Sequence, residues 1–197
     1  MELADGYATN ATIEKASLKA REKHYQKEII KMFKVGDKVI HNTYGLCEIA
    51  AIENANTYYG KQDCYIIYMQ RTKVMIPVAH AEMLRYPIKE EEVAKVLEVL
   101  SKSEGLPDEL TSKERIKIYT EKLVSNDILK IAEVLRGLAF LDTVDKLRGA
   151  EKNLFERINK ILSDEISFVQ NISKQEAQRL IQGCLKKIRE SAKCHKK

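Results

Sequence analysis

The sequence predicts an α+β protein, in which a small β-barrel at the front is followed by a compact all-α helical domain. Two patterns along the chain support this prediction. Apolar and polar residues alternate with a period of two between residues 32 and 86, as strands require. From residue 88 onward, apolar residues recur every three or four positions, as in amphipathic helices. The 197 residues are enough for two small domains.

The composition is that of a folded, globular chain. Hydrophobic residues make up 44% and charged residues 32%, which is too apolar for an obligately disordered protein. No run approaches the roughly 18 apolar residues that a membrane span needs. Asp5 and Glu14 lie where a secretory signal would be apolar. We therefore expect a cytoplasmic protein without a membrane partner.

The net charge of +5 comes from the end of the chain. Six of the last twelve residues are basic and one is acidic, so the charges of the remaining chain sum to zero. We expect residues 191–197 to be a solvated basic tail. A surface for a polyanion elsewhere in the chain must therefore come from local clustering of basic side chains.

Residues 1–31 hold too few apolar side chains to form a core. Asn10 or Thr12 is suited to cap a helix that would pass through Lys15 and Lys19. We expect this segment to be an N-terminal extension, flexible or helical, that is only loosely attached.

Five strand candidates lie between residues 32 and 86, where the barrel is expected. They are residues 38–41, 46–53, 63–70, 73–78 and, more briefly, 83–86. Turn-forming residues flank or separate them at 36–37, 42–45, 54–56 and 60–61. Five short strands within so few residues are typical of a small barrel of the SH3/Tudor-like kind.

Five helices are expected between residues 88 and 190, where they form a compact bundle. Their apolar stripes and caps are found at residues 93–100, 111–123, 125–138, 150–169 and 173–188. Two of them open with a capping box, in which a hydroxyl residue is followed three positions later by glutamate: Thr111 with Glu114, and Ser173 with Glu176.

Sequence motifs of enzymes are absent. The chain has no GxxxxGK[ST] phosphate loop and no GxGxxG, HExxH or GxSxG motif. His41 and Cys47 are candidates for a thiol–imidazole pair across a hairpin, but a surface histidine and a buried cysteine is the simpler interpretation. We expect no catalytic residue and no cofactor.

The four cysteines are scattered and contain no CxxC pair: Cys47, Cys64, Cys184 and Cys194. A disulfide scaffold is not expected in a chain of this length that is rich in helix formers. Cys184, Cys194 and His195 are candidates for a metal, but their spacing matches no zinc motif. We expect free thiols and no metal site.

Four segments, in order, carry the motifs of a known family. Residues 32–46 read MFKVGDKVIHNTYGL, residues 73–78 read KVMIPV, residues 121–127 read EKLVSND and residues 132–136 read AEVLR. They resemble the motifs F-x-V-G-D-x-V-V-Y-P-x-H-G-V, K-V-M-V-P-V, E-K-L-x-S-G-D and A-E-V-V-R of the CarD/CdnL family of bacterial transcription regulators. The resemblance extends from residue 32 to about residue 185, most of the chain.

The resemblance implies a function in transcription. In this family the barrel binds the β subunit of bacterial RNA polymerase, and the helical domain touches promoter DNA at the upstream edge of the melted bubble, which modulates open-complex stability. Residues 32–86 would then be the polymerase-interacting domain and residues 88–190 the DNA-contacting domain of a monomeric, non-enzymatic regulator.

The polymerase contact is expected at the edge of the barrel. A free strand edge allows the sheet of a partner to extend across it through main-chain hydrogen bonds. The candidate edge is short and β-branched, is guarded by basic residues and ends in proline: Arg71, Lys73, Val74, Met75, Ile76 and Pro77. The alternative is that this strand is internal.

The DNA contact is expected on and near the helix of residues 111–123. The basic residues concerned are Lys113, Arg115, Lys117, Lys122 and, further along the chain, Lys152. Of these, Arg115, Lys117 and Lys152 fall where the family presents basic residues to phosphates. Phosphate contacts carry no sequence information, so the binding should be largely sequence-independent. The alternative for this charge pattern is a helix face that is merely solvated. The alternative function is that of a polymerase-associated adaptor, whose helical domain binds another protein and not DNA.

Three positions depart from the family pattern. Many members have a tryptophan just before this helix, which wedges against the bubble edge in the minor groove. The chain contains no tryptophan, and Ser112 stands near that position. The tyrosine-proline pair after the first strand is replaced by His41 and Asn42, and the glycine of S-G-D is Asn126. The missing tryptophan bears on open-complex stabilisation and not on polymerase binding.

Overall fold

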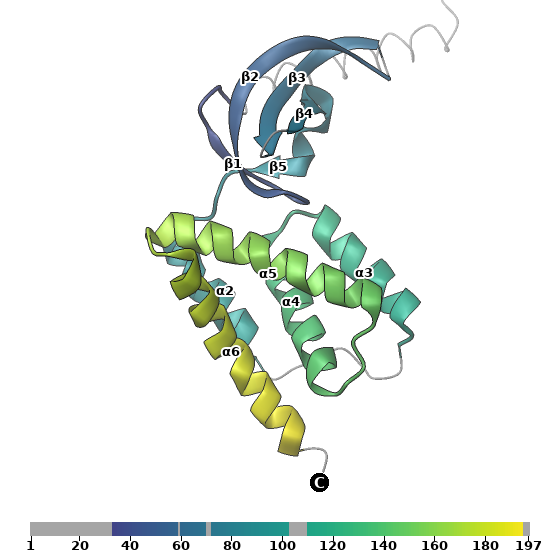
Figure 1. The fold of residues 1–197 in the computed structure, drawn as a ribbon, viewed down its shortest axis with the longest axis vertical. Coiled ribbons are helices and arrows are strands. Elements are labelled where there is room, and N and C mark those ends of the chain that lie inside the picture. The colour runs from purple at the N-terminus through teal and green to yellow at the C-terminus, as the bar shows by residue number, and fades with distance from the viewer. Residues whose placement is uncertain (1–32, 59, 70–71, 103–109, 195–197) are drawn as a thin grey trace, which may run out of the picture. The chain divides into compact units, whose positions relative to one another are not determined.

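The computed structural model describes residues 33–58, 60–69, 72–102 and 110–194 (Figure 1). The predicted extension at residues 1–31, Arg71 and His195 lie outside this part of the chain. The described residues form two compact units, one of residues 33–37 and 49–81 and one of residues 38–48 and 82–194. Below, they are called the sheet unit and the helical unit.

Five antiparallel strands follow one another along the first part of the chain. They are β1 (Lys38–His41), β2 (Gly45–Thr57), β3 (Gly60–Met69), β4 (Thr72–Pro77) and β5 (Leu84–Arg85). Their order in the sheet is β4-β3-β2-β1-β5, and the 3-10 segment η1 (Val78–Met83) connects β4 to β5. The α+β class is therefore confirmed, but the sheet is not closed in the described residues. β5 is only two residues long and pairs with β1 alone, so β4 and β5 remain as two ends.

The core of the sheet unit is built around β3, in which Cys64, Tyr65, Ile66 and Ile67 are all buried. The ring of Tyr65 on β3 is fully buried and meets the ring of Phe33 edge-on, with the centroids 5.6 Å apart. Ile67 and Ile76 are buried beside it, because antiparallel partners such as Tyr65 and Ile76 point to the same side of a sheet. Four buried residues in a row on β3 depart from the predicted period of two, because successive side chains point to opposite faces and both faces of this strand are covered here.

The hairpin of β2 and β3 is longer than predicted. Residues 54–56, expected as a turn, continue β2 and pair with residues 61–63 of β3. The amide of Asn54 donates to the carboxylate of Asp63 at 2.8 Å, so a turn-forming residue is satisfied across the strands instead. The expectation of a turn at 54–56 was therefore wrong, and the chain reverses between Thr57 and Gly60.

The helical unit contains five helices, each close to its predicted position. They are α2 (Glu90–Ser101), α3 (Ser112–Val124), α4 (Ile128–Thr143), α5 (Gly149–Gln170) and α6 (Lys174–Cys194). Both predicted capping boxes are present: the Thr111 hydroxyl accepts from the Glu114 backbone N–H at 3.3 Å, and the Ser173 hydroxyl accepts from that of Glu176 at 3.2 Å. Asn126 has φ of +54°, a left-handed conformation that asparagine adopts more readily than most residues.

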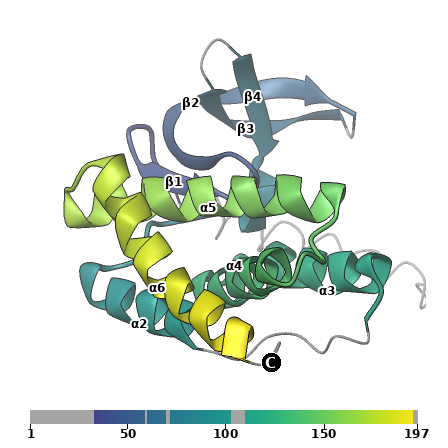
Figure 2. The ribbon, with the colours of Figure 1, turned by 60° about the horizontal axis from the view of Figure 1, so that its bottom comes forward.

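The helices share one apolar core, with α4 at its centre. Figure 2 shows α4 with α3 on one side and α2 on the other. Leu135 and Leu138 of α4 are fully buried, as are Leu100 of α2 and Leu162 of α5. The first hairpin of the sheet packs on the same unit: a side chain at Gly45 would meet Ile161 of α5 at 3.3 Å. The stripes read from the sequence are thus ordinary core residues.

β5 is fastened to α5 by a buried ion pair inside the helical unit. Arg85 donates to both carboxylate oxygens of Glu165, from Nη1 to Oε1 at 2.5 Å and from Nη2 to Oε2 at 2.7 Å. The backbone N–H of Ile88 also donates to Glu165 Oε1, at 3.0 Å. Glu165 is 0% exposed, so these three donors compensate a carboxylate that has lost its water.

Candidate functional site

β4 is the end strand of the sheet unit. Within the described residues it pairs with β3 and with no other strand, from Thr72 opposite Met69 to Pro77 opposite Cys64. An end strand has one row of main-chain groups that no neighbouring strand satisfies. The strand that the sequence singled out as the candidate edge therefore lies at a sheet end and is not internal.

The side chains of β4 alternate between the core and solvent. Ile76 is buried and Val74 half-buried, whereas Met75 is 47% exposed. Lys73 is exposed and pairs with Glu53 of β2, Nζ to Oε2 at 2.6 Å. Tyr68 of β3, opposite Lys73, is also exposed. The edge thus offers a strand ladder bordered by an apolar side chain and a lysine, which is suited to pairing with another strand.

Two of the predicted basic residues share an exposed face of α3. Lys113 and Lys117 are one turn apart, and both are exposed. Because an α-helix turns by about 100° per residue, Ile116 and Thr120 lie on the same face. The capping box at Thr111 fixes the first turn of this helix, and so the place of Lys113.

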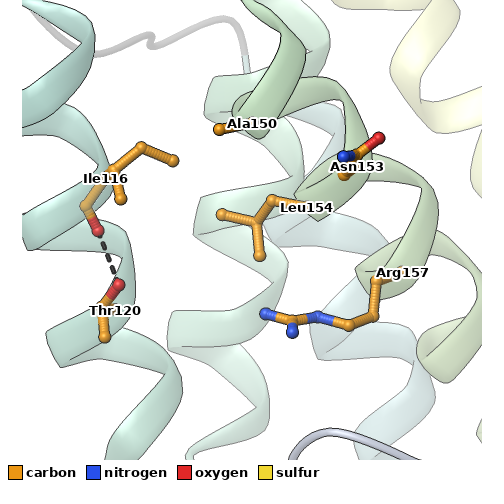
Figure 3. A pocket seen from close by; sticks show the side chains of 6 residues that line it. All are labelled: Ile116, Thr120, Ala150, Asn153, Leu154 and Arg157. Carbon is orange, nitrogen blue, oxygen red and sulfur yellow. Dashed lines mark hydrogen bonds between the residues drawn. The ribbon is translucent and has the colours of Figure 1, made fainter.

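A groove lies between this face of α3 and α5 (Figure 3). Its volume is about 340 Å³, and its lining comes from both helices: Ile116, Thr120, Ala150, Asn153, Leu154 and Arg157. The Thr120 hydroxyl is held by the backbone, since it donates to the Ile116 carbonyl at 2.8 Å. The floor is apolar, and Arg157 and Asn153 supply the polar atoms on the α5 side.

Arg157 was missed by the sequence reasoning. It is exposed, and it lies seven residues after Ala150 and four after Asn153, so all three share one flank of α5. This spacing was readable in the sequence, but nothing in the sequence showed that α5 would lie next to α3. The groove therefore has basic residues on both sides: Lys113 and Lys117 on α3, and Arg157 on α5.

Arg115, by contrast, lies inside the helical unit. Only 5% of the residue is exposed, and its Nε donates to Glu151 Oε1 at 2.7 Å. Its Nη1 donates to the Leu110 carbonyl at 2.5 Å. A guanidinium buried in this way is not presented to a phosphate, and we leave Arg115 out of the candidate DNA surface.

Lys122 and Lys152 point away from the groove. Lys122 is about half a turn from Lys117 on α3, and its ammonium pairs with Glu133 of α4 at 2.7 Å. Lys152 is exposed on α5, but lies on the flank of that helix opposite the groove-lining residues. The structure therefore brings together two of the five predicted basic residues and separates the other three.

His41 and Cys47 do not form a reactive thiol–imidazole pair. Burial lowers the pKa of His41 to about 4 and raises that of Cys47 to about 11, so both are neutral near pH 7. His41 Nδ1 accepts the backbone N–H of Thr43 at 2.9 Å and that of Tyr44 at 3.3 Å. Cys47 donates to the Gly45 carbonyl. The predicted surface histidine is in fact 5% exposed, and it shapes the hairpin turn.

The His41 shift predicts an acid-sensitive fold. Between pH 6.5 and about 4 the unfolded state binds a proton that the folded state excludes. The unfolding free energy should therefore fall by about 1.4 kcal/mol per pH unit in this window, with no effect above it. In His41→Asn, the amide oxygen can still accept from the turn, but nothing titrates. Urea unfolding at pH 7 and pH 5 should show a smaller loss in this variant; equal losses would contradict the assignment.

Cys47, Cys64 and Cys184 are not joined by a disulfide. The described residues contain no cluster of three or more side chains suited to hold a metal ion. Cys194 and His195 were named above with Cys184 as candidates for a metal. The structure does not describe the side chain of either residue. Within the described ranges, none of the helices has the length and apolar character required to cross a bilayer.

The described residues thus form an open antiparallel sheet that ends in β4, followed by helices that border a groove with basic residues on both sides. Comparison with known proteins identifies the family. Residues 33–88 match the CarD-like/TRCF RID domain, and residues 95–182 match the CarD C-terminal domain. The chain therefore belongs to the CarD-like family of transcription factors.

A curated relative agrees with this assignment. Over 153 residues the chain is 26% identical to a Bacillus subtilis (strain 168) protein named "Putative transcription factor YdeB". The alignment covers 74% of this chain and 97% of that protein. The resemblance read from the sequence motifs is thus confirmed, and it is a resemblance to a family of transcription factors.

Proposed function

We propose that this protein is a bacterial transcription regulator that binds the β subunit of RNA polymerase through β4 and contacts upstream promoter DNA through its helical unit. The polymerase contact is proposed because β4 is the end strand of the sheet and pairs, within the described residues, with β3 alone. The match of residues 33–88 to the CarD-like/TRCF RID domain supports it. Such a partner would make the protein cytoplasmic.

The polymerase contact involves Lys73, Val74, Met75, Ile76 and Pro77, with Arg71 next to them in the sequence. Main-chain hydrogen bonds would supply much of the affinity, because the free groups of β4 are already aligned. Met75 would be buried by the partner. Lys73, which forms an ion pair with Glu53, would lie at the rim of the interface. We propose that the protein is a monomer in this complex.

The DNA contact involves Lys113 and Lys117 of α3, and Arg157 of α5, around the groove. Three cations on two helices match the backbone of a duplex better than one helix face does. Because phosphates carry no sequence information, the binding would be sequence-independent and weak. Tethering to polymerase raises the effective concentration of nearby DNA, so weak contacts are sufficient. Lys122 and Lys152 would contribute only to the surrounding field.

The second candidate function is a polymerase-associated adaptor whose helical unit binds another protein. The apolar floor of the groove, formed by Ile116, Ala150 and Leu154, favours it. A phosphate backbone makes no use of that floor, whereas a partner helix would fill it. One simple experiment distinguishes the two functions: whether the protein binds duplex DNA at low salt.

We expect replacement of Lys113, Lys117 and Arg157 by glutamine to weaken duplex binding. The slope of log affinity against log salt should become shallower by about 0.9 for each lost phosphate contact. Fluorescence anisotropy with duplexes of unrelated sequence, from low to physiological salt, measures both quantities. Lys122→Gln with Lys152→Gln is the matched control, because it also removes charge but from other faces. A wild-type protein that captures polymerase and shows no duplex binding at low salt would favour the adaptor.

A further inference from the structure

We propose that Arg115 and Glu151 form a positioning pair, which sets the spacing of α3 and α5 on the two sides of the groove, and that Arg115 itself does not touch DNA. This inference rests on the proposed DNA contact and deepens it. It distinguishes Lys113 and Lys117, which are exposed on α3, from Arg115, which holds the helix in place.

The geometry of the pair is that of a buried bidentate link between two helices. Arg115 Nε donates to Glu151 Oε1 at 2.7 Å, and Arg115 Nη2 donates to Oε2 at 3.3 Å. The two side chains are 6% and 0% exposed. The third nitrogen, Nη1, donates to the Leu110 carbonyl just before α3. A planar guanidinium held at three points fixes direction as well as distance.

Glu151 in turn is fixed to the start of α5. Its Oε2 accepts the backbone N–H of Arg148 at 3.0 Å, which closes the capping box of this helix. Burial alone would raise the pKa of Glu151, but hydrogen bonds from Arg115, Arg148 and Ser112 outweigh it and lower the pKa. The carboxylate is therefore ionised at neutral pH, and ties both the first turn of α3 and the first turn of α5.

The pair joins the two helices at positions next in sequence to residues that line the groove. Arg115 precedes Ile116, and Glu151 follows Ala150, and both neighbours line the groove. A shift of either helix would therefore change the separation between Lys117 and Arg157. The pair has no net charge, so the Arg115 cation adds little field at the surface that a phosphate would meet.

Two kinds of variant test this role against direct contact. Replacing both members, Arg115→Met with Glu151→Met, removes the buried charges together, an exchange that proteins often tolerate. We expect the double variant to stay folded by circular dichroism and to keep the wild-type salt slope. Lys117→Met is the matched control, two residues away on the same helix, and its slope should fall by about 1.

Arg115→Lys is the second variant, because it keeps the positive charge but lacks the fork that binds both oxygens. We expect weaker duplex binding with an unchanged salt slope, since spacing is lost and charge is kept. The positioning role would be overturned if Arg115→Lys bound duplex with wild-type affinity. It would also be overturned if the salt slope of the double variant fell as it does in Lys117→Met. Neither result would contradict the DNA contact itself. A wild-type protein that binds no duplex removes the DNA contact itself, and this role with it.

Discussion

The Val74→Pro variant is expected to lose capture of bacterial RNA polymerase, with affinity reduced by at least about 100-fold. Proline at this position fixes φ and removes a main-chain donor from the pairing of Val74 with Ile67, so β4 is distorted and no longer offers a regular edge to a partner strand. The effect should be large because main-chain bonds carry strand addition and cannot be replaced by side chains elsewhere. The measurement is a pull-down from a bacterial lysate, followed by titration with purified polymerase.

Two further variants separate loss of the edge from damage to the sheet. Met75→Glu keeps the backbone but places a charge on the exposed side of β4, and should also weaken capture. Tyr58→Glu is the control. Tyr58 is 97% exposed and lies where the chain turns from β2 to β3, so its replacement should leave capture unchanged. Circular dichroism must show the helical unit intact in all three. Retained capture by Val74→Pro would reject the assignment of the edge.

The Glu165→Ala variant is expected to lose about 3–5 kcal/mol of unfolding free energy. The substitution leaves the Arg85 guanidinium, whose side chain is 17% exposed, without its carboxylate, and the Ile88 N–H without its acceptor, at a place where Glu165 itself is fully buried. Breaking one side of a buried pair costs much more than the pair contributes net, because the remaining charge is uncompensated. Urea unfolding, followed by circular dichroism, measures the loss.

Glu133→Ala is the matched control, because it also removes a helical glutamate from an ion pair, in this case with Lys122. Both side chains of that pair are partly exposed, so we expect a change of at most about 1 kcal/mol. Similar losses in the two variants would contradict the special role given to the Arg85–Glu165 link.

The periodicity of the sequence was sufficient to predict most elements. All five helices lie where apolar stripes and capping boxes indicated, because an amphipathic helix must bury one face and its first N–H groups need a cap. The prediction of a turn at 54–56 was wrong because the turn preference of asparagine is a local tendency, and here pairing with residues 61–63 of β3 holds the segment as a strand. Period two predicted the strands of the small barrel but not how far its sheet curls, and in the described residues the sheet stays open between β4 and β5.

The candidate site was less predictable than the fold. Charge and helical spacing placed Lys113 and Lys117 on one face, because both are properties of a single segment. Charge and spacing did not show that Arg115 would form an ion pair with Glu151, which lies 36 residues further along the chain. Nor did they show that Arg157 would line a groove opposite α3. Those contacts depend on how helices pack, and a basic residue next to an apolar stripe reads the same whether it is solvated or buried in an ion pair.

Site-specific crosslinking from β4 tests the central claim most directly. A photo-reactive amino acid replaces Met75, whose side chain is exposed at the middle of the strand, and the protein is mixed with bacterial RNA polymerase. The account predicts a crosslink to the β subunit from this position and none from Tyr58. Polymerase that binds the protein but crosslinks through another subunit, or only from Tyr58, would contradict it.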